Sequence, residues 1–291
     1  MDNRKIVCTN NEGMVVKFGS SFLPFLLANV DGLYGIKNKV SMSDNTMTDG
    51  ATYQGSVAQK RNIVLTLKTK ENHRLNRYEL YQLFPQDTKG TLTYIEDGVE
   101  RVIDYVVESI TPDSAKNVRT AVVSLLCPDP YFEATSDIEL TMAGWESGWE
   151  FIHEFVAEGE DFGHRVQDRL KTIENTSGAK GIGLTIEIYA NGQVDNPSIT
   201  HVESGDFIKV GTTAHPLELV NGDVLVITTH TNNKKVKLTH GGVTTEINEY
   251  LDEQSEFIQL QAGLNTIGYS ADSGESNMTV KLIYREKYLG A

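Results

Sequence analysis

The chain has 291 residues, of which 39% are hydrophobic and 23% charged, so it is long enough for two medium domains and has an ordinary globular composition. Its formal net charge of −14 argues against a nucleic-acid-binding protein, because carboxylates and phosphates repel each other. No apolar run approaches the roughly 20 residues of a membrane span, and the first residues do not have the pattern of a signal peptide.

The charge is unevenly distributed along the chain. Residues 1–134 hold 15 Lys and Arg against 16 Asp and Glu, a net charge of −1, whereas residues 135–291 hold 11 against 24, a net charge of −13. The acidity of the second half indicates either a solvated outer surface, which we favour, or a surface for a basic partner.

The first half predicts a β-rich domain with one helix. Residues 63–68 and 103–108 alternate between apolar and polar, which is typical of half-buried strands. Residues 118–127 are almost continuously apolar, which indicates a strand buried on both faces. A helix is predicted over residues 72–84, and Pro85 ends it, because the residue before a proline disfavours the helical conformation.

A proline-rich segment, residues 127–132, predicts the domain boundary. Its two prolines favour an extended backbone and cannot donate hydrogen bonds to a sheet. We therefore predict domains at residues 1–134 and 135–291. Residues 138–177 are ambiguous, because glutamates recur there at helical spacing while residues 149–156 alternate as in a strand. We favour the strand.

The rest of the second half predicts an antiparallel β-sandwich. Its segments alternate with period two, and glycine-containing turn signals such as Asn191-Gly192 and Gly241-Gly242 separate them. The predicted strands are residues 184–189, 224–229, 235–239 and 278–284.

The sequence contains no motif that predicts catalysis, a cofactor or a metal site. The glycine-rich residues 178–183 fit neither a Walker A loop nor a dinucleotide-binding fingerprint, and His153-Glu154 lacks the second histidine of a zincin helix. Cys8 and Cys127 lie in strand-like runs, and we favour two buried reduced thiols over a disulfide between them. We expect neither an enzyme nor a cofactor or metal; a cell-wall hydrolase is the enzymatic alternative.

A series of short landmarks runs along nearly the whole chain. The first is a glycine-containing aromatic loop, Asp49–Ser56, followed by an arginine and an apolar strand, Arg61–Leu67. In order and spacing the landmarks resemble the siphovirus tail component family, the phage distal tail proteins, although residues 138–177 are long and acidic for that family. The later landmarks are Tyr78–Phe84, Arg101 with Ile103, Cys127–Phe132, Ile186–Gly192, Asn196-Pro197, Gly222–Thr229, Leu260–Asn265 and Tyr284–Gly290.

The resemblance implies a mainly β structural virion protein and not an enzyme. Its N-terminal β-sandwich or split-barrel domain, with one helix, would form a homo-hexameric ring, and a galectin-like antiparallel β-sandwich would follow. The ring would sit at the tail tip, join the tail tube protein to the tip or hub protein, and dock receptor-binding or side-fibre proteins. The protein would be made in the host cytoplasm, and it would bind no nucleic acid and enter no membrane.

Two sets of candidate site residues follow. For the subunit or tube interface we expect Gly50, Tyr53, Gly55, Arg61, Tyr78 and Tyr81, from the loop, the strand after it and the helix. The alternative is an intramolecular turn and a helix that covers its own core. If the second domain is instead a carbohydrate-binding module, Trp145 and Trp149 are its ligand-facing aromatics; the alternative for both is core packing.

Overall fold

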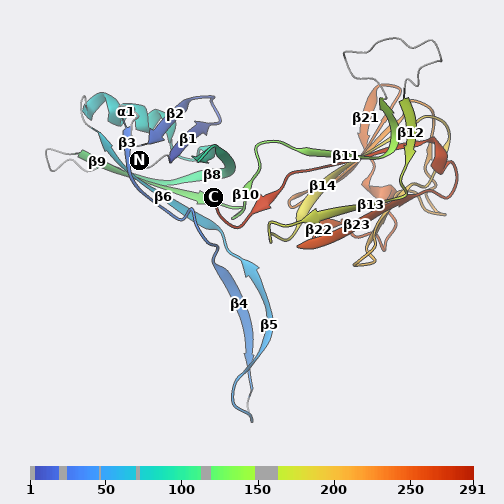
Figure 1. Cartoon of the computed structure of the whole chain (residues 1–291), viewed down its shortest axis with the longest axis horizontal. Helices are drawn as coiled ribbons and strands as arrows, with labels where there is room; N and C mark the ends of the chain where they lie inside the picture. Colours follow the sequence, from blue (N-terminus) through green and yellow to red (C-terminus); the bar gives the residue numbers. More distant parts are fainter. Residues whose placement is uncertain (1–3, 20–24, 46, 70–72, 113–118, 148–162) are drawn as a thin grey trace, which may run out of the picture. The chain divides into compact units, whose positions relative to one another are not determined.

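The computed structural model describes residues 4–19, 25–45, 47–69, 73–112, 119–147 and 163–291 (Figure 1). The predicted mainly β fold is confirmed, with one α-helix among these residues. The chain divides into two compact units, the first of residues 1–135 and 287–291 and the second of residues 136–286. Each unit has its own hydrophobic core.

The first unit is built on a sheet that closes on itself. Seven strands, taken in the order β8-β7-β1-β2-β3-β6-β9, form a ring because β9 pairs back onto β8, and β10 and β25 extend the sheet beside β8. Closure into a barrel leaves these seven strands paired on both sides. The strands are β1 (Lys5–Asn10), β2 (Val15–Gly19), β3 (Phe25–Asp31), β6 (Arg61–Thr69), β7 (Lys89–Glu96), β8 (Val99–Pro112), β9 (Arg119–Cys127), β10 (Phe132–Glu133) and β25 (Lys287–Tyr288).

The interior of this barrel follows from alternation in its strands. In β6, Ile63, Leu65 and Leu67 are fully buried while the residues between them are more exposed. Helix α1 (His73–Leu83) confirms the predicted helix, and its end brings the ring of Phe84 onto that of Phe18, with centroids 6.3 Å apart.

Strand β9 and the two cysteines both line this core, where we predicted a strand buried on both faces and two buried reduced thiols. Burial of β9 on both faces was wrong at Val122, which is 36% exposed because it lies on the outer surface of the barrel. Cys8 and Cys127 are both free and buried, as predicted.

Strands β4 (Asn38–Asp44) and β5 (Ala51–Ala58) form a separate two-stranded hairpin in the first unit, which extends away from the barrel (Figure 1). The segment that we expected to be a loop, residues 49–56, is therefore mostly strand. Residues 51–56 pair with Val40–Asp44 of β4.

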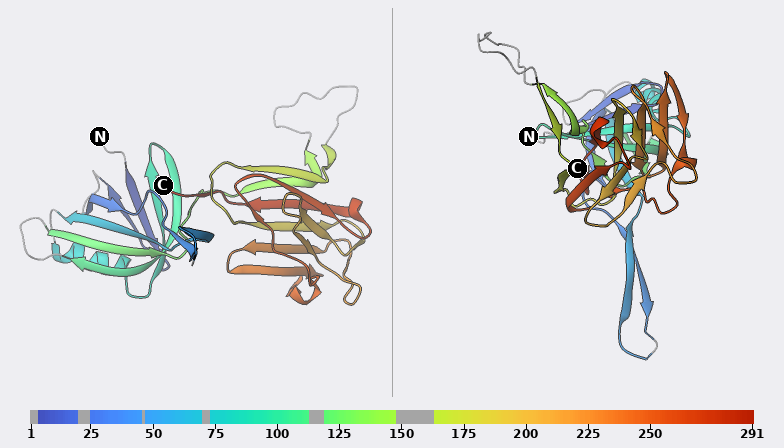
Figure 2. Two further views of the ribbon diagram at one scale, coloured as in Figure 1. Left: turned by 90° about the horizontal axis from the view of Figure 1, so that it is seen from below. Right: turned by 90° about the vertical axis from the view of Figure 1, so that its right-hand side faces the viewer.

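The second unit is an antiparallel sandwich of two sheets around one core (Figure 2). The larger sheet has the order β12-β11-β24-β14-β19-β20-β21, with β22 beside β14, and the smaller has the order β13-β23-β16-β17. The two-residue turn Gly241-Gly242 joins β20 to β21 with φ angles of +56° and +82°, which a tight hairpin needs.

The strand prediction for residues 138–177 is confirmed for β11, β12 and β13, while residues 148–162 lie outside the described residues. The strands of this unit are β11 (Ile138–Ser147), β12 (Gly163–Gln167), β13 (Leu170–Asn175), β14 (Ile182–Ala190), β15 (Val194–Asp195), β16 (Ser198–His201), β17 (Phe207–Lys209), β18 (Glu218–Leu219), β19 (Val224–His230), β20 (Asn233–His240), β21 (Val243–Glu246), β22 (Gln259–Leu260), β23 (Gly263–Ser270) and β24 (Met278–Tyr284), with short 3₁₀ helices η1 (Asn248–Tyr250) and η2 (Glu275–Asn277).

Candidate assembly interface

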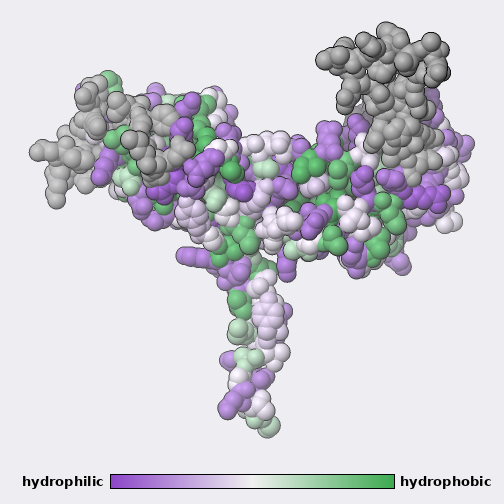
Figure 3. Space-filling model, in the orientation of Figure 1, coloured by the Kyte–Doolittle hydropathy of each residue, from purple (hydrophilic) through white to green (hydrophobic). Residues whose placement is uncertain are grey.

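The β4–β5 hairpin exposes apolar side chains along its length (Figure 3). Every residue of β4 is exposed, and β5 has only two partly covered residues, Gly55 and Ala58. Met42 is 62% and Tyr53 61% exposed. An isolated two-stranded ribbon is at best marginally stable in water, and a run of exposed apolar residues indicates a contact surface.

A β-bulge sorts the hairpin side chains onto two faces. Ser41 pairs with Gly55, but the next residue, Met42, pairs with Tyr53, so Gln54 is left out of register. Since directly paired residues point to the same face, the bulge places Tyr53 beside Met42 on the face that also carries Val40.

The opposite face of the hairpin is mostly hydroxyl-bearing. It carries Ser41, Ser43 and Thr52, with Lys39 and Val57 nearer the barrel, while Ser56 and Asp44 lie on the face with Met42. The largest apolar side chains of the hairpin are therefore concentrated on the Met42 face, and neither face is covered by its own chain.

The two glycines predicted for the interface have backbone roles in this hairpin. Gly50 lies in the turn with a φ angle of +96°, and Gly55 lies at the bulge with a φ angle of +148°. Both conformations favour glycine, because it has no Cβ atom to clash with the backbone. These residues shape the hairpin rather than offering side chains to a partner.

The predicted helix residues form a second exposed surface. Tyr78 is 50% and Tyr81 43% exposed, and Leu75 beside them is also exposed, whereas Leu80 and Leu83 are buried against the barrel. The guanidinium of Arg74 lies 5.9 Å from the Tyr78 ring centroid. Figures 1 and 2 show α1 on the other side of the barrel from the hairpin, so the structure does not bring the two sets of residues together.

Arg61, the remaining predicted residue, is only 6% exposed. Its guanidinium donates to main-chain carbonyl oxygens of its own unit, and burial lowers the pKa of this group. The structure thus places Arg61 under the hairpin and not on its surface. The side chains of Trp145 and Trp149 lie outside the described residues.

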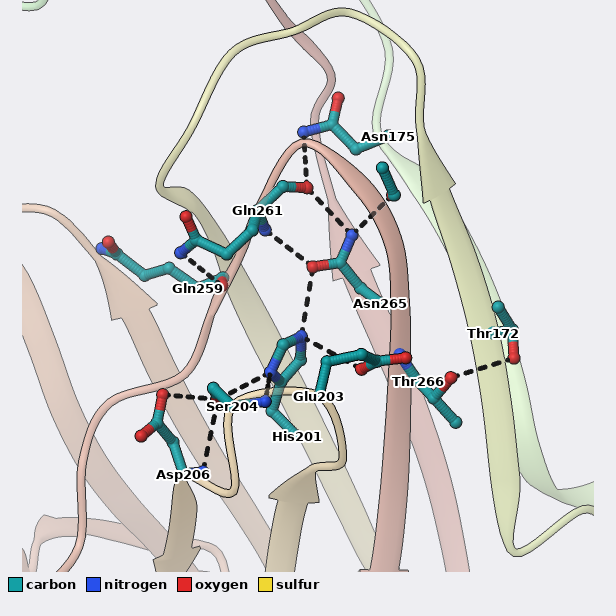
Figure 4. Close-up of polar contacts among 11 residues, drawn as sticks. Thr172, Asn175, His201, Glu203, Ser204, Asp206, Gln259, Gln261, Asn265 and Thr266 are labelled. Carbon is teal, nitrogen blue, oxygen red and sulfur yellow. Dashed lines mark hydrogen bonds and ion pairs between the residues drawn. The ribbon is translucent and has the colours of Figure 1, made fainter.

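A polar cluster in the second unit surrounds a buried histidine, His201 (Figure 4). Asn265 is fully buried, and its Nδ2 donates to the carbonyl oxygens of Gln261 and Gly263, each at 2.9 Å. Its Oδ1 therefore faces His201 Nε2 at 3.1 Å.

The other side of the His201 ring contacts the turn between β16 and β17. Nδ1 lies 2.7 Å from Ser204 Oγ, which donates to Asp206 Oδ2 at 2.6 Å, and hydrogen bonds from Thr266 lower the pKa of the neighbouring Glu203 carboxyl. In a nucleophilic triad the serine and the acid lie on opposite ring nitrogens. Here Ser204 lies on the Nδ1 side and Glu203 Oε2 lies 3.5 Å from Nε2. Ser204 Oγ donates to Asp206 instead, and Glu203 Oε2 accepts from the main-chain N–H of Thr266 at 2.7 Å, so the cluster fixes a turn to β23.

The described residues were also compared with the requirements of a metal site, an unsatisfied buried polar group and a transmembrane helix. Among the described residues, no group of three or more His, Cys, Asp or Glu side chains is placed to hold a metal ion. In the same part of the chain, every fully buried side-chain nitrogen or oxygen has a hydrogen-bond partner. We also find there no helix with the length and hydrophobicity that a transmembrane helix requires.

Comparison with solved structures shows the same fold in phage tail proteins. The SPP1 Dit (gp 19.1) protein, described as a paradigm of the hub adsorption apparatus in phages infecting Gram-positive bacteria, is similar with a TM-score of 0.68 at 15% identity, over 97% of this chain and 99% of that one. A chain of the phage P2 baseplate in its activated conformation with Ca is similar with a TM-score of 0.51 at 12% identity, over all of both chains. None of the curated proteins matches this chain in sequence.

Family models match both halves of the chain. A phage tail protein RIFT-related domain matches residues 17–127, and a siphovirus-type tail component C-terminal domain matches residues 177–288. The two matches cover most of the chain, and the family consists of structural components of phage tails. The chain therefore belongs to the siphovirus-type tail component family, the distal tail proteins of phages.

Proposed function

We propose that six copies of this tail protein form a ring at the distal end of the tail, through contacts of the first unit. The ring joins the tail tube above to the tip or baseplate hub protein below. Receptor-binding or side-fibre proteins dock on its periphery, and the chain is synthesised in the host cytoplasm before it enters the virion.

The observation that carries the proposal is the unpartnered apolar face of the β4–β5 hairpin, formed by Val40, Met42 and Tyr53. Covering this face with a second copy removes apolar area from water and supplies the packing that an isolated ribbon lacks. The unpaired outer edges of the two strands also offer main-chain hydrogen bonds to a neighbour. In a ring the hairpin of one copy meets a different surface on the next, so the contact repeats until the ring closes.

The charge distribution favours assembly through the first unit. Residues 1–134 have a net charge of −1, so six copies can pack closely without strong mutual repulsion, whereas residues 135–291 have a net charge of −13. The exposed face of α1, with Leu75, Tyr78 and Tyr81, is a second surface on the same unit for a copy or for the tube protein.

The test is the mass and shape of the purified full chain, measured by light scattering and negative-stain imaging. We expect annular particles of six times the chain mass of 32.3 kDa. Tyr53→Asp buries a charge in the proposed contact and should abolish the rings. Thr52→Asp, a matched change on the hydroxyl face, should leave most of the rings intact.

A strictly monomeric wild-type chain at high concentration, also in the presence of its tail neighbours, would rule the proposal out. Rings that form equally well from Tyr53→Asp would show that this face is not part of a required contact.

A further inference from the structure

Arg61 connects three parts of the first unit that are far apart in the sequence. It is the first residue of β6, and two residues separate it from the end of the hairpin strand β5. Its Nη1 donates to Gly32 O at 2.7 Å and Leu33 O at 2.9 Å, just before the hairpin begins. Its Nε donates to Pro130 O at 2.7 Å, and its Nη2 to Leu289 O, near the C-terminus, at 2.6 Å.

The carbonyl acceptors satisfy the donors of the Arg61 guanidinium. The guanidinium lies 5.0 Å from the Phe132 ring centroid, and its Nε, Nη1 and Nη2 donate to neutral main-chain carbonyls. A buried donor that loses its acceptor costs more than an average hydrogen bond contributes, because water does not replace the partner. Removing Leu289 therefore takes away the acceptor of Nη2 in this set.

The last five residues are held firmly in the first unit. Lys287 and Tyr288 form β25, which pairs with β10. Lys287 Nζ lies 2.6 Å from Asp129 Oδ2, and the guanidinium of Arg101 lies 3.2 Å from the Tyr288 ring centroid.

The C-terminal residues reach the same carbonyl as Arg61. Ala291 N donates to Leu33 O at 3.2 Å, so Leu33 O accepts hydrogen bonds from both. An open pocket of about 550 Å³ lies beside this point, lined by residues 31, 32, 34–37, 59–62 and 64. Hydrogen bonds from Arg61 and Ala291 therefore contribute to holding the hairpin base beside a space that side chains do not fill.

We propose that Arg61 and residues 287–291 form a latch that positions the β4–β5 hairpin for contact with the next copy. This inference rests on the proposed function for the identity of the hairpin's partner.

Two variants of the full chain test the latch. Deletion of residues 289–291 removes the Leu289 acceptor and the Ala291 donor but retains β25. Arg61→Lys keeps the charge, but an ammonium group cannot reproduce the planar fork that reaches separate acceptors. Val16→Ala is the control, because it removes a buried side chain of the barrel away from the hairpin.

The direct measurement is hydrogen exchange at the Gln59 amide, which donates to Lys37 O at the hairpin base. In both latch variants we expect exchange at the Gln59 amide to accelerate about tenfold, which is the effect of losing one hydrogen bond to a charged group. We expect the fraction of chains in rings to fall by about tenfold or more. Val16→Ala should lower the thermal stability of the first unit while both readouts stay at the wild-type level.

Two results would overturn the latch. Unchanged exchange at the Gln59 amide in the deletion variant contradicts the latch. This result applies even if the wild-type chain forms no rings, so failure of the latch can be distinguished from failure of the proposed function. Rings at the wild-type fraction from both latch variants overturn it while leaving the proposed function intact.

Discussion

The β4–β5 hairpin of the first unit and the β19–β20 hairpin of the second are both pairs of antiparallel strands, but they differ in how far the rest of the chain buries them. In β19 every second residue is fully buried, and Ile227 packs into the sandwich core. In β4 no residue is buried, and Met42 is mostly exposed to solvent. Exposed apolar side chains without a core beneath them are typical of a surface that contacts another molecule.

This contrast also separates the two units by role. The second unit buries alternate residues of β14, β19 and β24 in one continuous core, and the His201 cluster is satisfied by its own chain, while single apolar residues such as Val243 and Leu264 are exposed. The first unit closes its barrel but leaves its longest projection uncovered. We therefore expect assembly through the first unit, where the apolar side chains of the β4–β5 hairpin are not covered by their own chain.

The largest expected effect is on the free energy of unfolding, in which a core substitution and a hairpin substitution should differ strongly. Ile227→Ala should lower the free energy of unfolding of the second unit by about 2–5 kcal/mol, because it leaves a cavity at a fully buried site. Met42→Ala should change the stability of the single chain by less than about 0.5 kcal/mol. Denaturant unfolding at low protein concentration measures both. A Met42→Ala loss as large as that of Ile227→Ala would mean that Met42 is already buried by its own chain.

A smaller effect is expected at the bulge. Gly55→Ala meets no neighbouring atom within 4 Å, so its cost is conformational: the φ angle of +148° should cost about 1–3 kcal/mol with any other residue. Relief of this strain shifts the pairing of β5 by one residue and turns Tyr53 to the hydroxyl face. The ring fraction, measured by light scattering, should fall about tenfold or more.

Ser41→Ala is the matched control, since Ser41 pairs with Gly55 and lies on the hydroxyl face. It should leave the ring fraction unchanged. If Gly55→Ala assembles as well as Ser41→Ala, the bulge does not set the contact face.

Much of the fold is predictable because alternation reports directly on burial. Ile63 to Leu67 and Leu184 to Ile188 alternate because one face of each strand meets a core. The hairpin was the exception: strand β5 carries no such pattern, because neither of its faces is buried, and its residues 51–56 were therefore interpreted as part of a loop. The sequence predicted this segment as an interface but did not predict its conformation.

The latch was not predictable from the sequence for a different reason. The acceptors of Arg61 are main-chain oxygens of Gly32, Leu33, Pro130 and Leu289, and a main-chain carbonyl leaves no mark in a residue pattern. Nothing in the last residues indicated that they return to the first unit. The arginine was singled out by resemblance, and only the structure gives it a positioning role.

The most direct test of the central claim is the thiol reactivity of Met42→Cys in the free chain and in the ring. The native thiols provide a silent background, because burial raises the pKa of Cys8 and raises that of Cys127 to about 12, so neither forms the reactive thiolate near pH 8. If the apolar hairpin face is covered by the next copy, iodoacetamide should modify Cys at position 42 at least about tenfold more slowly in rings than in the free chain. An equal rate in both states would contradict the account.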